Sequence, residues 1–333
     1  MRILLTNDDG IRAPGIVALY DALMDTIPGL EGTLGGPIRI AGTPIETIFT
    51  VAPATVQSAT SHGVTFHEPL MVEHARIRGR MAGAAVDGRP ADCVKLALSE
   101  IWPGQFGTGS TPDLVISGMN AGANCGINVI YSGTVAAAIE AAFLGIPSIA
   151  VSLHLGKAST RFDIGAIHAR RAIESLLAGG LPKPHEVLNL NVPRCEDPIE
   201  DTPEAKAEAD RQRTSAGLPT NFDQSDTRVT QQANDQIHPA NADERLPIVV
   251  CPMNTHGHVD RFEGRVSPGG RAYFWAAAGG MDFQDTEPGS DVDWLFQRAV
   301  TVTPLRYDLT DTDAVDRWTQ AAGTQPTATG RGA

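Results

Sequence analysis

The chain alternates short runs of aliphatic and β-branched residues with segments in which apolar residues recur every three or four positions. The short runs predict strands at residues 2–6, 47–52, 113–117, 148–152 and 187–192. Helical spacing occurs at residues 16–24, 90–101, 132–144 and 162–178. Strands that alternate with helices indicate parallel pairing, because each parallel connection crosses over through a helix. We therefore predict an α/β fold with a three-layer α/β/α, Rossmann-like, mostly parallel sheet and ligands at the carboxyl ends of its strands.

This alternation ends near residue 195. Residues 196–245 are mostly Asp, Glu, Gln, Thr, Pro and Ala, so we expect a polar, mobile insertion that buries too little apolar surface to become ordered. Strand-like segments return at residues 271–277 and 299–307, and Pro304 confines the end of the second segment to a sheet edge. The predicted organisation is a Rossmann-like catalytic core (1–195), the insertion (196–245), C-terminal strands and an arm that complete the same domain (246–312), and a flexible tail (313–333).

Composition excludes several classes of partner. The 26 Lys and Arg residues against 39 Asp and Glu give a formal net charge of −13, without the basic footprint that long nucleic acids or anionic membranes require. A small anionic substrate is compatible with this charge if a metal cation or a helix N-terminus offsets it locally. Four dispersed cysteines without a CxxC pair, and a start without a signal-peptide core, favour a cytoplasmic protein. The apolar stretch 135–153 contains Glu140, Gly145 and Pro147, so we do not expect it to span a membrane.

Asp8 and Asp9, at the end of the first predicted strand, are the strongest chemical signal. Two carboxylates about 4 Å apart repel by roughly 4 kcal/mol at an effective dielectric constant of about 20, and a divalent cation removes that cost. Hard oxygen ligands favour Mg²⁺, Mn²⁺ or Ca²⁺ over zinc. The alternative is a turn in which Asp9 caps the following helix, since Gly10 and Pro14-Gly15 permit such a turn.

Two further loops carry candidate chemistry. The segment 117–124 contains Asn120 and Asn124 among glycines, which suits either a plain turn or a site with a neutral hard ligand. Residues 131–134 open an alanine-rich helix, where a serine or threonine cap and a phosphate site are compatible interpretations.

Other polar residues are weaker candidates. The adjacent pair Ser61-His62 does not by itself make a catalytic dyad, and no GxSxG elbow occurs. His256 and His258 lack a third ligand nearby, which favours loop histidines over a metal site. Cys93 and Cys125 have no basic neighbour, which favours packed side chains over nucleophiles.

Three of the polar loops follow strands of one predicted parallel sheet, including the loop 57–62 after the second strand. The carboxyl ends of parallel strands share one edge, so these loops are expected to converge there. Two carboxylates, a hydroxyl, an Asn amide and a helix N-terminus together describe a metal-assisted phosphate site.

Longer sequence blocks sharpen this prediction. The chain resembles the SurE (survival protein E) family of metal-dependent 5′-nucleotidases. The resemblance is carried by MRILLTNDDGIRAPGI, VAPATVQSATSHGVTFHEPL, GRPADCVKLAL, PDLVISGMNAGANCG, YSGTVAAAIEAAFLGIPSIAVS, LNLNVP and TVTPLRYDLT. These blocks occupy most of residues 1–195 and part of 265–311, in the family's order.

The resemblance implies a site and an assembly. One divalent cation per subunit, Mg²⁺ or Mn²⁺, is expected on four ligands, namely Asp8, Asp9, Ser58 and Asn120. The two carboxylates are also the expected catalytic residues. The positions expected to contact the substrate phosphate are Asn7, Asn124, Ser132, Gly133 and Thr134. A homodimer, or a dimer of dimers, is implied through the C-terminal arm.

The implied reaction is hydrolysis of nucleoside 5′-monophosphates to nucleoside and phosphate, with 3′-monophosphates and short polyphosphate as further substrates. Asp8 or Asp9 orients or deprotonates the attacking water in this hypothesis. One alternative is a haloacid-dehalogenase-type phosphatase, although that chemistry uses two Asp separated by one residue. Another is a nucleotide- or metal-binding sensor without turnover.

The sequence also departs from the family pattern. Arg89 stands where the family usually has Thr, and Gly63 where Ser often follows Ser-His. The insertions at 29–42 and 196–245 are longer than usual, and the first contains no lysine that would make it a phosphate-binding P-loop. We expect these departures to affect the substrate mouth or the dimer contact rather than the chemistry.

Overall fold

The computed structural model describes residues 1–58, 60–156, 158–197, 211, 239–257, 262–276, 281 and 283–322. Within these residues one sheet contains β1 (Arg2–Thr6), β4 (Thr47–Pro53), β5 (Val72–Ile77), β6 (Met81–Val86), β7 (Leu114–Ala121), β8 (Ser148–Leu153), β9 (Val187–Val192), β10 (Ile248–Val250) and β13 (Val300–Leu305). Its order is β10-β13-β9-β8-β7-β1-β4-β6-β5. The neighbours are parallel except for the β13–β9 and β5–β6 pairs, which confirms the predicted mostly parallel sheet.

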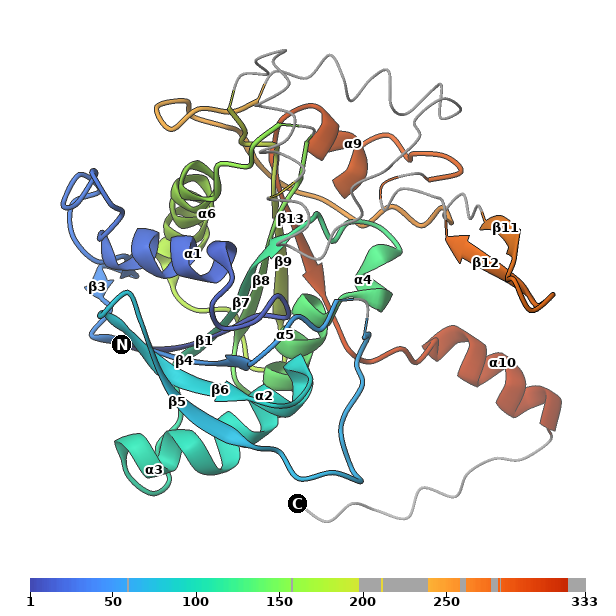
Figure 1. Ribbon diagram of the computed structural model, residues 1–333, viewed down its shortest axis with the longest axis horizontal. Coiled ribbons are helices and arrows are strands. Elements are labelled where there is room, and N and C mark those ends of the chain that lie inside the picture. Colours follow the sequence, from blue (N-terminus) through green and yellow to red (C-terminus); the bar gives the residue numbers. More distant parts are fainter. Residues whose placement is uncertain are drawn as a thin grey trace.

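Helices cover both faces of the sheet. They are α1 (Pro14–Met24), α2 (Pro90–Leu96), α3 (Trp102–Phe106), α4 (Asn128–Tyr131), α5 (Gly133–Phe143) and α6 (Phe162–Leu176). Figure 1 shows α1 and α6 on one side of the sheet and α2, α3 and α5 on the other. In β1, Ile3 and Leu5 pack into the core beneath α1 and α6, whereas Leu4 packs into the core on the opposite face. Successive strand residues alternate between faces, so a wholly apolar strand requires a helical layer on each side.

Several element boundaries differ from those predicted. The helix expected over residues 90–101 leaves α-geometry after Leu96, passes through a π-helical turn at Ala97–Ile101 and continues as α3. The strand expected over 113–117 extends as β7 to Ala121. The edge hairpin of β5 and β6 was not predicted, because β5 is largely exposed and carries charged residues in place of an apolar run.

The C-terminal region adds strands to the same sheet and a short helix, α9 (Asp291–Phe296). β13 lies between β10 and β9, but β10 pairs only with its first three residues, up to Val302. Pro304 therefore lies beyond the end of β10, where its missing N–H leaves no partner unpaired. This agrees with the expectation that the proline lies where the sheet has an open edge.

Smaller elements stand apart from the sheet. They are a turn of β2 (Arg39–Ile40) and β3 (Thr43–Pro44), a 3₁₀ turn at Leu177–Gly179, a hairpin of β11 (Phe262–Val266) and β12 (Ala272–Ala276), and α10 (Thr312–Ala322). The hairpin and α10 project from the body of the molecule in Figure 1. α10 occupies the start of the segment expected to be a flexible tail, because Val315 and Trp318 recur at helical spacing. The remainder of that tail and most of 196–245 lie outside the described residues. Among the described helices, none has the length and apolarity needed to cross a membrane.

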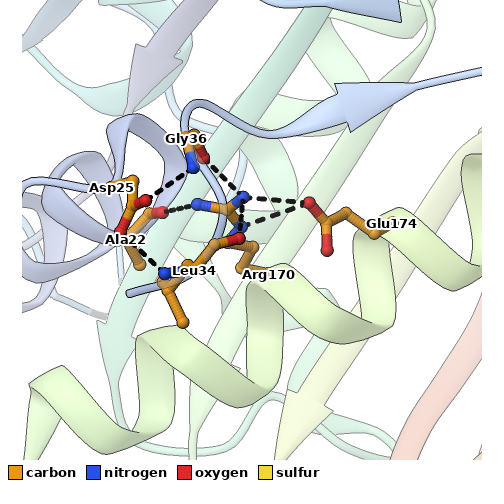
Figure 2. A network of polar contacts seen from close by, with 6 residues as sticks. All are labelled: Ala22, Asp25, Leu34, Gly36, Arg170 and Glu174. Carbon is orange, nitrogen blue, oxygen red and sulfur yellow. Dashed lines mark hydrogen bonds and ion pairs between the residues drawn. The ribbon is translucent and has the colours of Figure 1, made fainter. Parts of the chain in front are cut away.

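A buried arginine attaches the insertion 29–42 to the helical layer (Figure 2). The Arg170 guanidinium, on α6, donates hydrogen bonds to the carbonyl oxygens of Ala22, Leu34 and Gly36 and to the Glu174 carboxylate. The Asp25 carboxylate accepts two backbone N–H groups of the same insertion, at 3.1 and 2.6 Å. α1 starts at the carboxyl edge of the sheet and runs back along it, so its last residues and the insertion lie at the opposite edge. The insertion therefore does not border the carboxyl ends of the strands, contrary to a role at the substrate mouth.

We expect Arg170→Met to lower the free energy of unfolding by about 3 kcal/mol, because buried carbonyl groups lose their donor. Urea denaturation followed by circular dichroism measures this change. The control is Arg76→Met, which removes an exposed arginine of β5 whose one bond to a described residue is to Gly79 O, and it should change stability by less than about 0.5 kcal/mol. A loss below about 1 kcal/mol for the Arg170 variant would contradict a structural role for this network.

Candidate functional site

The strand order changes direction at β1. The chain first adds β4 and β6 on one side of β1, and later adds β7, β8 and β9 on the other side. Thr6 of β1 is in register with Ser117 of β7, so the loops that leave these two strands begin side by side. Such loops diverge to opposite faces of the sheet and leave a crevice at the carboxyl ends of the strands, where α/β proteins bind ligands. Asp8 and Asp9 lie in the first of these loops.

Backbone contacts draw the neighbouring loops toward the two aspartates. The Gln57 N–H donates to the Asp8 carbonyl oxygen at 2.8 Å, which fixes the loop after β4 beside Asp8. The Ala121 N–H donates to Asp9 Oδ2 at 2.9 Å, which fixes the end of β7 beside Asp9. Because Gln57 precedes Ser58 and Ala121 follows Asn120, both additional predicted ligands are brought to the same edge as the carboxylates.

The N-terminus of α5 meets the Asp8 side chain. Thr134 Oγ1 donates to Asp8 Oδ1 at 2.5 Å, and Ser132 caps the helix by accepting the Val135 N–H at 3.1 Å. A Cβ on Gly133 would lie 2.9 Å from both Cβ and Oδ2 of Asp8, so only glycine permits this approach. The first turn of a helix carries N–H groups without intrahelical partners, and these favour an anion.

Burial raises the pKa of both carboxyl groups. For Asp8, burial and the charge of Asp9 raise the pKa to about 7, although the hydrogen bond from Thr134 acts in the opposite direction. Burial also raises the pKa of Asp9, against the effect of the Ala121 N–H. Two adjacent carboxyl groups in this state are costly to ionise alone, and a cation between them lowers that cost.

Ser58 and Asn120 offer neutral oxygens. Ser58 is exposed, and its hydroxyl has no hydrogen-bond partner in the described part of the chain. Asn120 donates through Nδ2 to the Gly122 carbonyl oxygen at 2.7 Å, which leaves Oδ1 as the atom for a ligand. The arrangement agrees with the donor types predicted for these two positions.

Asn7 and Asn124 are more firmly held than the sequence suggested. Asn7 Nδ2 donates to the Gly10 carbonyl oxygen at 2.9 Å, while its buried Oδ1 lacks a partner among the described residues. Asn124 donates through Nδ2 to Ser152 and through its backbone N–H to Asn191, both at 2.8 Å. Asn124 therefore links the loop after β7 to the ends of β8 and β9.

The donor set fits a hard divalent cation. No three His, Cys, Asp or Glu side chains gather as a potential metal cluster within the described residues. The predicted ligands are two carboxylates and two neutral oxygens, a set that suits Mg²⁺ or Mn²⁺ with water in the remaining positions. The orphaned Asn7 Oδ1 and the unfavourable pair of carboxylates mark this edge as a place where a further polar partner belongs.

Sequence reasoning missed a second polar cluster, which lies beside the site. Glu140 of α5 is buried and contacts His62 Nε2 at 2.7 Å and Lys95 Nζ at 3.2 Å. Burial raises the pKa of Glu140, but the hydrogen bonds from His62 and Lys95 outweigh it, so the net shift is downward. The His62 ring also stacks on Phe143, with centroids 5.3 Å apart. A lone carboxylate in an alanine-rich helix was the signal that could have identified this cluster.

A buried carboxylate also joins the C-terminal region to the site loop. Asp291, at the start of α9, is fully buried and accepts the backbone N–H groups of Gly126, Asn254 and Val292 at 2.8–2.9 Å. Gly126 lies two residues after Asn124. The C-terminal segment therefore supports the loop that follows β7, which the sequence pattern did not indicate.

The weaker candidates take no part in this edge. Ser61 Oγ donates to the Ile130 carbonyl oxygen at 2.8 Å, so Ser61 and His62 have separate partners. The four cysteines are buried and free, and burial raises the pKa of the Cys93 and Cys125 thiols, as expected of packed side chains. His256 faces Asn254 and Asp285, and His258 lies outside the described residues.

We expect Asp8→Asn to stabilise the metal-free protein above pH 7. The pKa of Asp8 is about 7 in the folded protein against 3.8 for an ordinary aspartate, so the folded state holds this proton more tightly. Between these pH values the stability of the wild type therefore falls as pH rises, and the amide escapes that loss. The expected gain in Tm at pH 8 with EDTA is about 2–6 °C, shrinking toward pH 4.

Differential scanning calorimetry at pH 4, 6 and 8 measures this difference. Added Mn²⁺ should stabilise the wild type and leave the Asp8 variant unchanged, because only the wild type keeps both carboxylates. Equal Tm values for the wild type and the Asp8 variant at pH 8 would show that ionising Asp8 does not lower the stability of the folded protein.

Comparisons with known proteins agree with this geometry. The family model described as Survival protein SurE matches residues 3–214. The chain is 35% identical over 318 residues to the 5′-nucleotidase SurE of Desulforudis audaxviator, with 95% of each chain covered. It is 36% identical over 318 residues to the 5′-nucleotidase SurE of Rhodopirellula baltica, with 94% of this chain and 95% of the relative covered. The crystal structure of the SurE protein from Aquifex aeolicus matches with a TM-score of 0.65 and 28% identity, covering 97% of this chain and all of the other. The predicted resemblance is confirmed, and the chain belongs to the SurE family.

Proposed function

We propose that the protein is a divalent-metal-dependent phosphatase that hydrolyses nucleoside 5′-monophosphates to nucleoside and phosphate. The observation that carries the proposal is the contact of Asp8, which adjoins Asp9, with the N-terminus of α5 at one edge of the sheet. Relatives matched over nearly the whole chain bear the name 5′-nucleotidase, which supports the same activity here.

Four residues would hold one Mg²⁺ or Mn²⁺ ion per subunit, namely Asp8, Asp9, Ser58 and Asn120. When bound, the cation supplies Lewis acidity and a water of lowered pKa. Asp8 is kept in place by Thr134, and Asp9 by the Ala121 N–H, so both carboxylates are oriented before any ligand arrives. One of the two orients or deprotonates the attacking water.

The N-terminus of α5 would hold the substrate phosphate. Ser132 caps this helix, Gly133 and Thr134 begin its first turn, and Asn7 and Asn124 lie in the neighbouring loops. Negative charge on the transferring group is favoured by the unpaired N–H groups and the positive end of the helix dipole. The helix terminus and the cation together offset the acidic charge of the chain where the phosphate binds.

The β11–β12 hairpin supports a homodimer, or a dimer of dimers. On one face of the hairpin, Phe262, Val266 and Phe274 have exposed fractions of 66, 70 and 69%. The opposite face also exposes Trp275, at 61%, and exposed apolar side chains on a projecting hairpin are typical of a subunit contact. The buried, unpaired cysteines support a cytoplasmic location.

We expect activity to require both the metal and Asp9. EDTA-treated protein should release no phosphate from AMP, and Mn²⁺ or Mg²⁺ should restore release. Asp9→Asn should lower kcat/KM by on the order of a thousandfold, whereas Glu100→Gln, an exposed acidic residue of the π-helical turn, should retain activity. A panel of 5′- and 3′-monophosphates and tripolyphosphate defines the substrate range. Wild-type turnover by the Asp9 variant in EDTA would overturn the metal assignment.

We expect Phe274→Lys to shift the assembly toward monomer, because a charge replaces apolar surface in the proposed contact. Sedimentation velocity of the wild type and the variant measures this shift. Tyr273→Lys, on the opposite face of the same hairpin, is the matched control and should leave the assembly unchanged. A monomeric wild type, or an unchanged assembly in the Phe274 variant, would contradict the proposed contact.

A further inference from the structure

Arg89 is an exposed cation beside the candidate site. Its guanidinium forms no ion pair or hydrogen bond with a described residue, and its backbone N–H donates to Asp92 Oδ2. The neighbouring cation Lys95 is engaged, since it contacts the buried Glu140. The charge of Arg89 is therefore free to act on a ligand.

The chain places Arg89 at the rim of the phosphate site. Pro90, the next residue, begins α2 and packs against the start of α5. Its Cγ lies 3.2 Å from the position that a Gly133 Cβ would occupy, and Asp8 Oδ2 lies 2.9 Å from the same position. Arg89 is thus one residue removed from a side chain that borders both Gly133 and the Asp8 carboxylate.

The Arg89 side chain lies across Gly63. Its Nη1, Cζ and Cδ atoms are 2.1, 3.0 and 3.1 Å from the position that a Cβ on Gly63 would occupy. Gly63 belongs to the loop after Ser58, which contacts α4 through Ser61 and Ile130 and α2 through Thr65 and Asp92. The two departures from the family pattern, Arg89 and Gly63, are therefore in direct contact. Because Gly63 has no side chain, the Arg89 side chain fits in the space beside it.

We propose that Arg89 is a specificity-determining residue, which binds an anionic group on the part of the substrate that lies beyond the transferred phosphate. The proposal rests on the proposed phosphatase function and names a substrate class for the same site, a nucleoside carrying a second phosphate. A guanidinium presents paired donors that match phosphate oxygens, and an unpaired one at the mouth of a site in an acidic protein also draws in anions.

The probe is a pair of substrates that share one base, adenosine 3′,5′-bisphosphate and AMP, each assayed for release of the 5′-phosphate. We expect Arg89→Gln to lower the ratio of kcat/KM for the bisphosphate to that for AMP by about 10- to 100-fold, mainly through KM. Arg89→Lys should recover part of the ratio, because it restores the charge without the paired donors. Arg76→Gln, an exposed arginine on β5, is the control for loss of one positive charge and should leave the ratio unchanged.

Gly63→Ser tests the contact independently. A Cβ there displaces only the far end of the Arg89 side chain, and Gly63 does not have a positive φ that would strain a serine. We expect this variant to lower the same ratio, and the double variant Gly63→Ser/Arg89→Gln to lower it no further than Arg89→Gln alone. An unchanged ratio in Arg89→Gln, or equal losses for AMP and the bisphosphate, would overturn the proposal. A wild type without phosphatase activity toward any substrate would instead overturn the proposed function.

Discussion

The repulsion between a buried carboxylate, Asp8, and its half-buried neighbour, Asp9, governs the arrangement of this protein's functional edge. Asp8 and Asp9 follow a strand that is buried on both faces, and Asp8 is itself buried while Asp9 is half-buried. Their pKa values are raised by burial, and that of Asp8 also by its neighbour's charge. Ionising the two carboxyl groups therefore costs free energy in the protein alone, and a bound cation would lower that cost.

The surrounding contacts hold these carboxylates without neutralising them. Thr134 supplies a hydroxyl donor and Ala121 a backbone donor, while Gly133 lets the N-terminus of α5 approach closely. A neutralising arginine or lysine at this place would compete with a metal ion. The described contacts of the two carboxylates are instead with neutral donors, and nearby Lys95 contacts Glu140.

The position of the site follows from the order of the strands. Because β7 is added on the opposite side of β1 from β4, loops from distant parts of the chain meet where the order reverses. The C-terminal region reinforces this edge through Asp291, which accepts the Gly126 N–H. At the rim, Arg89 and Gly63 come from different loops and fit together sterically, which gives the acidic protein a cation beside its phosphate site.

The sequence by itself determined the class of fold and predicted that Asp8 and Asp9 bind a divalent cation. Apolar runs such as residues 2–6 followed by helical spacing specify strands and helices locally, since periodicity reports which side chains are buried. The adjacent carboxylates at a strand end indicated a cation because two neighbouring negative charges repel each other and a divalent cation removes that cost. Tertiary structure alone decided which distant residues meet. The edge hairpin of β5 and β6, the contact of Glu140 with His62, and the position of Arg89 over Gly63 depend on pairings between remote segments. Periodicity carries no information about such pairings, because they arise only when the whole sheet and its helices pack together.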